Sequence, residues 1–149
     1  MSFIIRPSVP TDVTAMMQLI QELAHFEKAP QEVVATEATL LSSGFSENPH
    51  FVSWVALQDD VVVGLALCYV RYSTWKGPVL YLEDLIVTEA QRGKGIGKAL
   101  FEMCIDHAKQ QNYRRMVWQV LDWNIPAIEF YKGYGAHVEE GWLNASIDF

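Results

Sequence analysis

The sequence predicts a mixed α/β protein, in which one mostly antiparallel sheet is covered by helices. Three observations favour this fold class. Two long apolar segments, residues 51–57 and 61–72, are separated by only three residues, which is typical of an antiparallel hairpin. A third apolar segment, residues 79–87, follows a short turn, and a helix and a strand come after it. Meandering strands followed by a β-α-β unit predict a mixed sheet rather than a purely parallel one.

The first part of the chain predicts one short strand and two helices. Residues 3–5 are apolar, and Thr11 and Asp12 then offer side chains that can cap a helix. Residues 36–41 predict a second, shorter helix that ends near Gly44. The first helix carries apolar residues at helical spacing, which we assign to the core: Val13, Met16, Met17, Ile20, Leu23 and Ala24.

The last part of the chain alternates helices with strands. Residues 116–121 predict a strand, and Asn124 can cap a short helix that runs to Lys132. Residues 136–149 predict a final strand. Before them, residues 95–111 predict a helix with one apolar face, formed by Ile96, Ala99, Leu100, Met103, Cys104 and His107.

Composition limits the class of protein. Half of the 149 residues are hydrophobic and 19% are charged, and no linker, repeat or low-complexity segment divides them, so we expect one domain over residues 1–149. The net charge of −7 argues against a nucleic-acid partner, because phosphate contacts need clustered cations. An acidic protein is better suited to attract cations.

The cysteines, the histidines and the N-terminus exclude several other classes. Cys68 and Cys104 each lie in an apolar stretch and are predicted to be buried thiols. The four histidines lack the paired spacing of a zinc site, so we expect no metal. The first residues do not resemble a signal peptide, and no apolar stretch approaches the roughly 20 residues of a membrane span. We therefore expect a cytoplasmic protein with no membrane contact.

The most informative segment is a glycine-rich loop between a predicted strand and a predicted helix. Glycine lets the backbone approach an anion closely, and the N–H groups at a helix N-terminus bind phosphate oxygens. Alternating glycines beside three cations suit a pyrophosphate, although a turn that merely caps the helix is the alternative. The loop that we assign to the anion consists of Arg92, Gly93, Lys94, Gly95, Ile96, Gly97 and Lys98.

Two common nucleotide motifs do not fit this loop. A Walker A motif needs glycine and a hydroxyl residue where the chain has Arg92 and Ala99. A dinucleotide fingerprint that starts at Gly93 needs glycine or alanine where the chain has Lys98.

Residues 91–97 match the Q/R-x-x-G-x-G/A loop of the GCN5-related N-acetyltransferases, and the chain resembles this family along almost its whole length. That resemblance implies a fold with a splayed pair of central strands and a loop that cradles the pyrophosphate of acetyl-CoA. Further segments resemble the diamine (spermidine/spermine) and thialysine branch: Tyr81-Leu82-Glu83-Asp84, Trp123-Asn124-x-Pro126, Phe130-Tyr131-Lys132, Glu139-Glu140-Gly141-Trp142, and Glu22-Leu23-Ala24 with Glu27. The chain departs from this branch at Phe26, where tyrosine is common, and in ending at Phe149, where relatives are often longer.

The resemblance implies acetyl transfer from acetyl-CoA to the primary amine of a small cationic acceptor, either a polyamine or diamine or a thialysine-like amino acid. The amine would attack directly in a ternary complex. A free N–H on the splayed strand can stabilise the developing oxyanion. Besides the loop, the resemblance implies these cofactor-binding residues: Leu85, Ile86 and Val87 along the pantetheine arm, and Asn124, Pro126, Ala127 and Lys132.

The resemblance also assigns the proton transfers. Tyr131 is predicted to be the general acid for the departing thiolate, because a phenol with a pKa near 10 is protonated at neutral pH. Tyr134 and Tyr113 are the alternatives for this role. Glu83 is predicted to bind the ammonium group and to help deprotonate it, directly or through water.

Three further residues are expected to bind the acceptor. Asp84 follows Glu83, and strand alternation predicts that the two side chains point to opposite faces. Phe26 and Glu27 would form a second, anionic wall at the acceptor entrance. Carboxylates that line a cleft would explain a preference for cationic amines.

Several alternatives stay open at this point. The acceptor can be another amine, such as an amino acid, an aminoglycoside or a protein lysine, and a non-catalytic acetyl-CoA sensor is the alternative outside the enzyme class. The resemblance also implies a homodimer. Tyr69, Tyr72 and Trp75 can line its interface or fill the local core.

Overall fold

The computed structural model describes residues 2–149. The chain divides into two compact units, residues 2–118 and Gln119–Phe149, which are treated in turn. The first unit contains one five-stranded sheet whose strands follow the order of the sequence. The first four strands are antiparallel, and the fifth is parallel to the fourth, so the predicted mixed sheet is confirmed. The strands are β1 (Ile4–Pro7), β2 (Val52–Gln58), β3 (Val61–Ser73), β4 (Gly77–Val87) and β5 (Met116–Val117).

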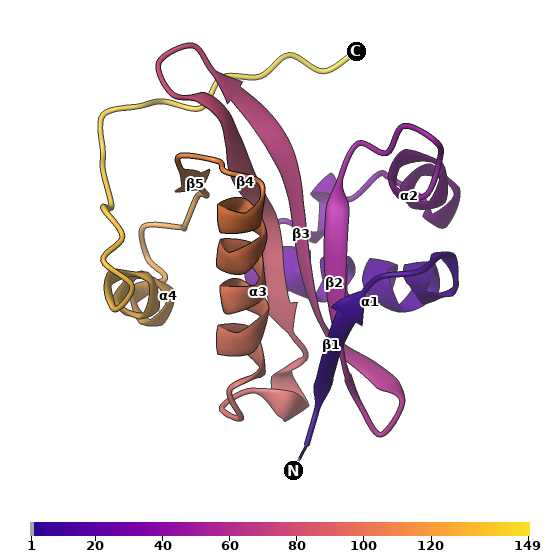
Figure 1. Cartoon of the computed structure of the whole chain (residues 1–149). Coiled ribbons are helices and arrows are strands. Elements are labelled where there is room, and N and C mark those ends of the chain that lie inside the picture. Colours follow the sequence, from indigo (N-terminus) through magenta and orange to yellow (C-terminus); the bar gives the residue numbers. More distant parts are fainter. Residues whose placement is uncertain (1) are drawn as a thin grey trace. The chain divides into compact units, whose positions relative to one another are not determined.

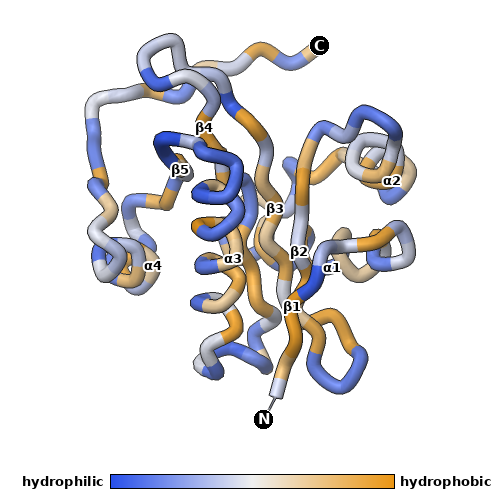
Figure 2. Tube along the Cα trace, in the orientation of Figure 1, coloured by the Kyte–Doolittle hydropathy of each residue, from blue (hydrophilic) through white to orange (hydrophobic). Residues whose placement is uncertain are grey.

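Helices cover both faces of this sheet. α1 (Val13–Phe26) and α2 (Glu37–Gly44) lie on one side, and α3 (Ile96–Gln110) lies on the other (Figure 1). Short 3₁₀ turns at Pro10–Asp12, Pro30–Glu32 and Glu89–Gln91 connect these elements. Figure 2 shows apolar residues along the central strands, where the helices cover them.

A cluster of buried side chains between α1 and the sheet shows which strand residues face α1. The buried cluster there consists of Met16, Leu19, Val55, Leu57, Leu65, Leu67 and Ile86. Leu19 completes the apolar stripe that the sequence predicted for α1, while Ile20 and Leu23 pack against the cluster half-buried. Because side chains alternate along a strand, Leu65, Leu67 and Ile86 mark the face of β3 and β4 that looks toward α1.

The opposite face of the sheet packs against α3. Leu100, Phe101 and Cys104 of α3 are fully buried there. Cys68 of β3 and Cys104 lie with their sulfur atoms 3.6 Å apart, and neither is exposed, so the prediction of two buried thiols is confirmed. The hydrogen bond to Cys104 and burial both raise the pKa of the Cys68 thiol, which keeps it protonated.

β5 is shorter than the predicted strand of residues 116–121. Its ladder with β4 contains only the pairs Leu80–Met116 and Tyr81–Val117. β4 nevertheless runs on to Val87, paired with β3 alone. The two strands therefore separate after Tyr81, which agrees with the splayed pair that the family resemblance implied.

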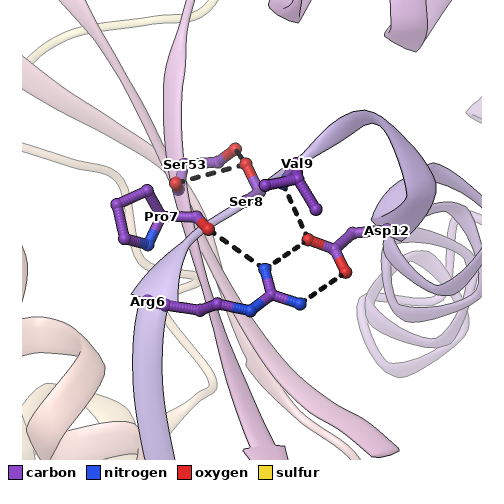
Figure 3. A network of polar contacts seen from close by, with 6 residues as sticks. All are labelled: Arg6, Pro7, Ser8, Val9, Asp12 and Ser53. Carbon is purple, nitrogen blue, oxygen red and sulfur yellow. Dashed lines mark hydrogen bonds and ion pairs between the residues drawn. The ribbon is translucent and has the colours of Figure 1, made fainter.

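The junction between β1 and α1 is a polar network rather than a simple helix cap. The sequence indicated that the Asp12 side chain can cap α1, but in the structure it does not. Its carboxylate accepts a hydrogen bond from the Val9 N–H at 2.8 Å and pairs with the Arg6 guanidinium through contacts of 2.7 and 3.0 Å (Figure 3). The Ser8 hydroxyl meets Ser53 of β2 beside this pair. The ion pair between Arg6 and Asp12 thus holds the start of α1 against the end of β1.

The second unit contains α4 (Ile125–Lys132), whose first turn is capped by Asn124, as predicted. The Asn124 side chain accepts a hydrogen bond from the Ala127 N–H at 3.4 Å. The predicted final strand is wrong, because residues 136–149 form neither helix nor strand. A strand requires a hydrogen-bonded neighbour, and within this unit, as far as the structure describes it, no strand offers one. Its apolar residues Trp142, Leu143 and Ile147 are exposed.

Among residues 2–149, no helix combines the length and the apolar character needed to cross a membrane.

We predict that Asp12→Ala lowers the free energy of unfolding by about 2 kcal/mol at pH 7, because it leaves the Arg6 charge without its buried partner. The guanidinium lowers the pKa of Asp12, so this contribution is present above the unfolded pKa and is lost as the pH falls through the folded pKa. Urea unfolding of wild type and variant at pH 7 and at pH 3 measures both effects. The control is Asp106→Ala, an exposed carboxylate on α3. Equal losses in the two variants would contradict this role of the Arg6–Asp12 pair.

Candidate functional site

Glu22 of α1 connects this helix to the segment that precedes the glycine loop. Its carboxylate accepts hydrogen bonds from the Thr88 hydroxyl at 3.0 Å and from the Glu89 N–H at 2.9 Å. It also lies 3.8 Å from the Arg92 guanidinium. One side chain of α1 therefore holds the turn after β4 and the first cation of the loop.

Arg92 is held by three groups at once. Besides its pairing with Glu22, its Nε donates to the Val87 carbonyl at 2.8 Å. Its guanidinium lies over the Phe26 ring, 5.6 Å from the centroid. A pocket of about 350 Å³ lies beside Arg92 and is lined by Glu22, His25, Phe26, Glu89 and Arg92. Arg92 thus braces the loop against α1, in addition to the anion-binding role that the sequence assigned to it.

Two glycines of the loop adopt backbone angles that other residues disfavour. Gly93 and Gly95 have φ angles of 78° and 85°, in the left-handed region that side chains disfavour. A Cβ at either position would meet no atom within 4 Å, so the backbone angle, rather than space, requires glycine. Gly95 is the N-cap residue, directly before the first residue of α3.

The first N–H groups of α3 have no acceptor within the helix, and the helix dipole favours an anion there. Residues 92–95 are exposed. Lys94 donates to the Gln91 side chain at 2.6 Å, and Lys98 lies 3.9 Å from Glu102 on the surface of α3. The N–H groups at the start of α3, the exposed loop before them and the two lysines fit the pyrophosphate that the sequence analysis assigned to this loop.

A β-bulge in β4 determines where the predicted acceptor residues point. Leu67 of β3 pairs with Asp84, but Cys68 pairs with Leu82, so Glu83 is an extra residue on β4. Residues directly opposite each other share a face of the sheet. Asp84 therefore shares the α1 face with Leu67. The hydroxyl of Tyr69, which shares this face with Leu67, lies 3.5 Å from the Glu83 carboxylate. The bulge therefore interrupts the alternation, and the expectation that Glu83 and Asp84 point to opposite faces is corrected.

Three carboxylates gather at this place. Glu27 follows the last residue of α1, and its charge interacts with those of Glu83 and Asp84. Burial and the charge of Glu83 raise the pKa of Glu27. Burial, with the charges of Glu83 and Glu27, raises the pKa of Asp84 to about 7. The sequence could not place these three carboxylates relative to one another, and in residues 2–118 they lie within range of one another's charges. We call Glu27, Glu83 and Asp84 the acidic cluster.

A pair of tyrosines lies beside the acidic cluster. Tyr69 of β3 lies opposite Tyr81 of β4, and their ring centroids are 5.1 Å apart. The Tyr69 hydroxyl lies 3.5 Å from a carboxylate oxygen of Glu83. Burial and the Glu83 charge raise the pKa of both phenols, so both stay protonated at neutral pH. The Arg71 guanidinium lies over the Tyr81 ring, 5.6 Å from its centroid.

This arrangement can bind a cation and accept its proton. Three carboxylates beside aromatic rings attract an ammonium group. A carboxyl with a pKa near 7 can take a proton from a bound ammonium at neutral pH and release it again. In the part of the chain that the structure describes, no group of three or more His, Cys, Asp or Glu side chains is arranged to hold a metal ion.

The residues predicted along the pantetheine arm lie on the part of β4 that has no β5 partner. Leu85 is half-buried, and Ile86 and Val87 are buried. Because β4 pairs only with β3 here, its other edge is not engaged by a ladder with β5. This edge is where the sequence analysis placed a backbone donor.

The remaining predicted residues belong to the second unit. Tyr131 is half-buried on α4, with its ring edge-on to Phe130 at 5.4 Å. Asn124, Pro126 and Ala127 form the start of α4, and Lys132 is its last residue. Their place relative to the glycine loop and the acidic cluster stays a prediction.

Of the alternative tyrosines, Tyr113 packs near His107, at a ring distance of 6.5 Å, on the α3 side of the sheet. That is the side opposite the acidic cluster.

Sequence reasoning named Glu22 only as part of the family resemblance, without a role, and missed Arg71. A signal for each was present, because Glu22 lies one helical turn before Phe26 and Arg71 lies two strand positions after Tyr69. Those spacings place each pair on a common face.

Comparison with known proteins agrees with this geometry. Residues 14–136 match the Acetyltransferase (GNAT) family. The chain is 38% identical to the mouse (Mus musculus) thialysine N-epsilon-acetyltransferase, over 94% of this chain and 89% of that protein. It is 36% identical to the human (Homo sapiens) spermidine/spermine N(1)-acetyltransferase-like protein 1, over 94% of this chain but only 22% of that protein.

A solved aminoglycoside N-acetyltransferase in complex with CoA superposes with a TM-score of 0.73 at 21% identity. This superposition covers 98% of this chain and all of the other, and it shows a shared fold. A sheet that splays after Tyr81, a glycine loop at the start of α3, and these similarities lead to one conclusion: the chain belongs to the GNAT family of N-acetyltransferases, which use acetyl-CoA.

Proposed function

We propose that this N-acetyltransferase transfers the acetyl group to the primary amine of a small cationic acceptor, either a diamine or polyamine or a thialysine-like amino acid. The observation that carries this proposal is the acidic cluster, where Glu27, Glu83 and Asp84 converge beside two tyrosine rings. The names of the thialysine and spermidine/spermine relatives support an acceptor of this size and charge.

The acidic cluster can do two things for such an acceptor: it can bind the ammonium ion and it can accept a proton from it. A primary amine is an ammonium ion at neutral pH, so it is attracted by carboxylates but cannot attack until it loses a proton. Glu83 is exposed, while Asp84 is half-buried with a pKa of about 7. Glu83 binds the ammonium, and the proton passes to the cluster directly or through water. The neutral amine then attacks, so that a C–N bond forms and the C–S bond breaks.

The donor side uses the glycine loop and β4. The N–H groups at the start of α3, with Lys94 and Lys98, bind the pyrophosphate of acetyl-CoA. The edge of β4 without a β5 partner accommodates the pantetheine arm at residues 85–87. Tyr131 gives its proton to the departing thiolate, and residues 124, 126, 127 and 132 hold the cofactor from α4. In this proposal both units form one catalytic domain.

We also propose that the enzyme is a cytoplasmic homodimer. Tyr72 and Trp75, at the tip of the β3–β4 hairpin, are 72% and 89% exposed, which supports an interface there. Tyr69 differs from them, because its ring packs on Tyr81 beside the acidic cluster. A monomeric mass in solution would contradict the dimer.

The experiment that tests the proposed function follows thiol release from acetyl-CoA with a panel of amines: spermidine, spermine, putrescine, thialysine, lysine and an aminoglycoside. We expect turnover with one or more of the small cationic amines and little with the aminoglycoside. Turnover of the aminoglycoside alone, or of no amine, would contradict the proposal.

We predict that Tyr131→Phe lowers kcat by about 10²- to 10⁴-fold, the range typical of a lost general acid, while the affinity for CoA is nearly unchanged. Tyr134→Phe is the matched control, because Tyr134 lies just after α4 and its ring also packs against Phe130. Steady-state kinetics and calorimetric CoA titration measure both quantities. An unchanged kcat in Tyr131→Phe would show that Tyr131 is not the acid, and a loss in Tyr134→Phe alone would assign the role to Tyr134.

We predict that Glu22→Gln weakens CoA binding about 3- to 30-fold, because the loss of the charge releases Arg92 and loosens the turn before the loop. The Kd for CoA should rise, while the KM for the amine changes little. Asp106→Asn, an exposed carboxylate on α3, serves as the control. A normal Kd in Glu22→Gln would show that the loop keeps its conformation without this contact.

A further inference from the structure

Arg71 is a cation on the face of the sheet that carries the acidic cluster. It lies two positions after Tyr69 on β3 and opposite Val79 on β4, so its side chain emerges on the α1 face. Its guanidinium lies over the Tyr81 ring. The residue is exposed, and among residues 2–149 its guanidinium forms no ion pair. The charge is therefore available to a ligand.

Two aromatic rings separate this cation from the acidic cluster. From one end to the other, Arg71 contacts Tyr81, Tyr81 packs on Tyr69, and the Tyr69 hydroxyl lies near Glu83. The charges at the two ends act on the same phenols in opposite directions, since Glu83 raises the pKa of Tyr69 and Tyr81 whereas Arg71 lowers it. This face of the sheet thus has an anionic end, an aromatic middle and a cationic end.

The spacing of the two ends fits a short, extended molecule. Arg71 lies four residues along β3 from Leu67, which pairs with Asp84. At about 3.3 Å per residue this is about 13 Å between backbone positions. The long arginine side chain shortens the distance between the charged groups. A ligand with an ammonium group, a few methylene groups and a carboxylate can span it.

We propose that Arg71 binds a carboxylate of the acceptor, and that the acceptor is therefore an α-amino acid with an amine at the end of its side chain rather than a diamine or polyamine. This inference rests on the proposed acetyl transfer at the acidic cluster. A guanidinium and a carboxylate form strong, often bidentate hydrogen bonds. A diamine or polyamine instead brings a second ammonium toward Arg71, where like charges repel.

The test compares acceptors that differ only in the carboxylate. Ornithine and putrescine form one such pair, and lysine and cadaverine form another. We expect kcat/KM of the wild-type enzyme to be about tenfold higher, or more, for the amino acid of each pair. Arg71→Met should remove most of this preference by lowering kcat/KM for the amino acids, mainly through KM. The two diamines should be acetylated as well as before, or better. Arg71→Lys should restore part of the preference.

The control is Lys76→Met, which removes an exposed cation from the tip of the same hairpin and should leave the preference intact. Unchanged thermal unfolding of Arg71→Met would show that the variant is folded, as expected for an exposed side chain. Equal kcat/KM within each wild-type pair, or equal losses for both members in Arg71→Met, would overturn the role of Arg71 and leave the proposed acetyl transfer standing. Failure of every amine to react would overturn the proposed function, and this inference with it.

Discussion

One extra residue in β4 sets the positions of the charged groups on the acceptor face. Glu83 has no partner of its own on β3, because Leu67 pairs with Asp84 and Cys68 pairs with Leu82. Without this bulge, regular alternation would turn Asp84 to the α3 side, into the apolar layer around Leu100 and Cys104. With it, Asp84 lies on the α1 side beside Glu27, and its burial there raises its pKa to about 7. A local change in the ladder thus brings together the groups that can bind and deprotonate an ammonium ion.

α1 connects the two halves of the site. Its face toward the sheet is held by Met16 and Leu19, which are buried in the core. Near its end it presents Glu22 to the turn before the glycine loop, and Glu27 to the acidic cluster. Donor and acceptor sides therefore depend on the packing of one helix, and the Arg6–Asp12 pair fixes where that helix begins. A shift of α1 would disturb both sides together, which is a reason for so many contacts at its two ends.

Much of the fold could be predicted because its signals are local. The short connection between β2 and β3, the apolar stripe of α1 and the cap at Asn124 each depend on neighbours in sequence. The glycine loop was also predictable, since Gly93 and Gly95 occupy backbone angles that other residues disfavour.

The bulge at Glu83 could not be predicted, because it is a property of the pairing between two strands. Residues 136–149 carry an apolar pattern that predicted a strand, yet a strand forms only where a partner supplies the ladder. For the same reason, the contacts of Glu22 with residues 88 to 92 and of Arg71 with Tyr81 became visible only in the folded chain.

The titration of Asp84 tests the central claim most directly. Carbon-13 NMR of the aspartate carboxyl groups, with Asp84→Asn to assign the signal, gives its pKa with and without a cationic amine. If the acidic cluster is the acceptor site, the pKa of Asp84 should be about 7 in the free protein. It should fall when the amine binds, because an adjacent positive charge favours the carboxylate. In the free enzyme the carboxyl is then protonated below pH 7 and charged above it, so amine binding should strengthen as the pH rises through this value. A pKa near 4 that a bound amine leaves unchanged would contradict the account.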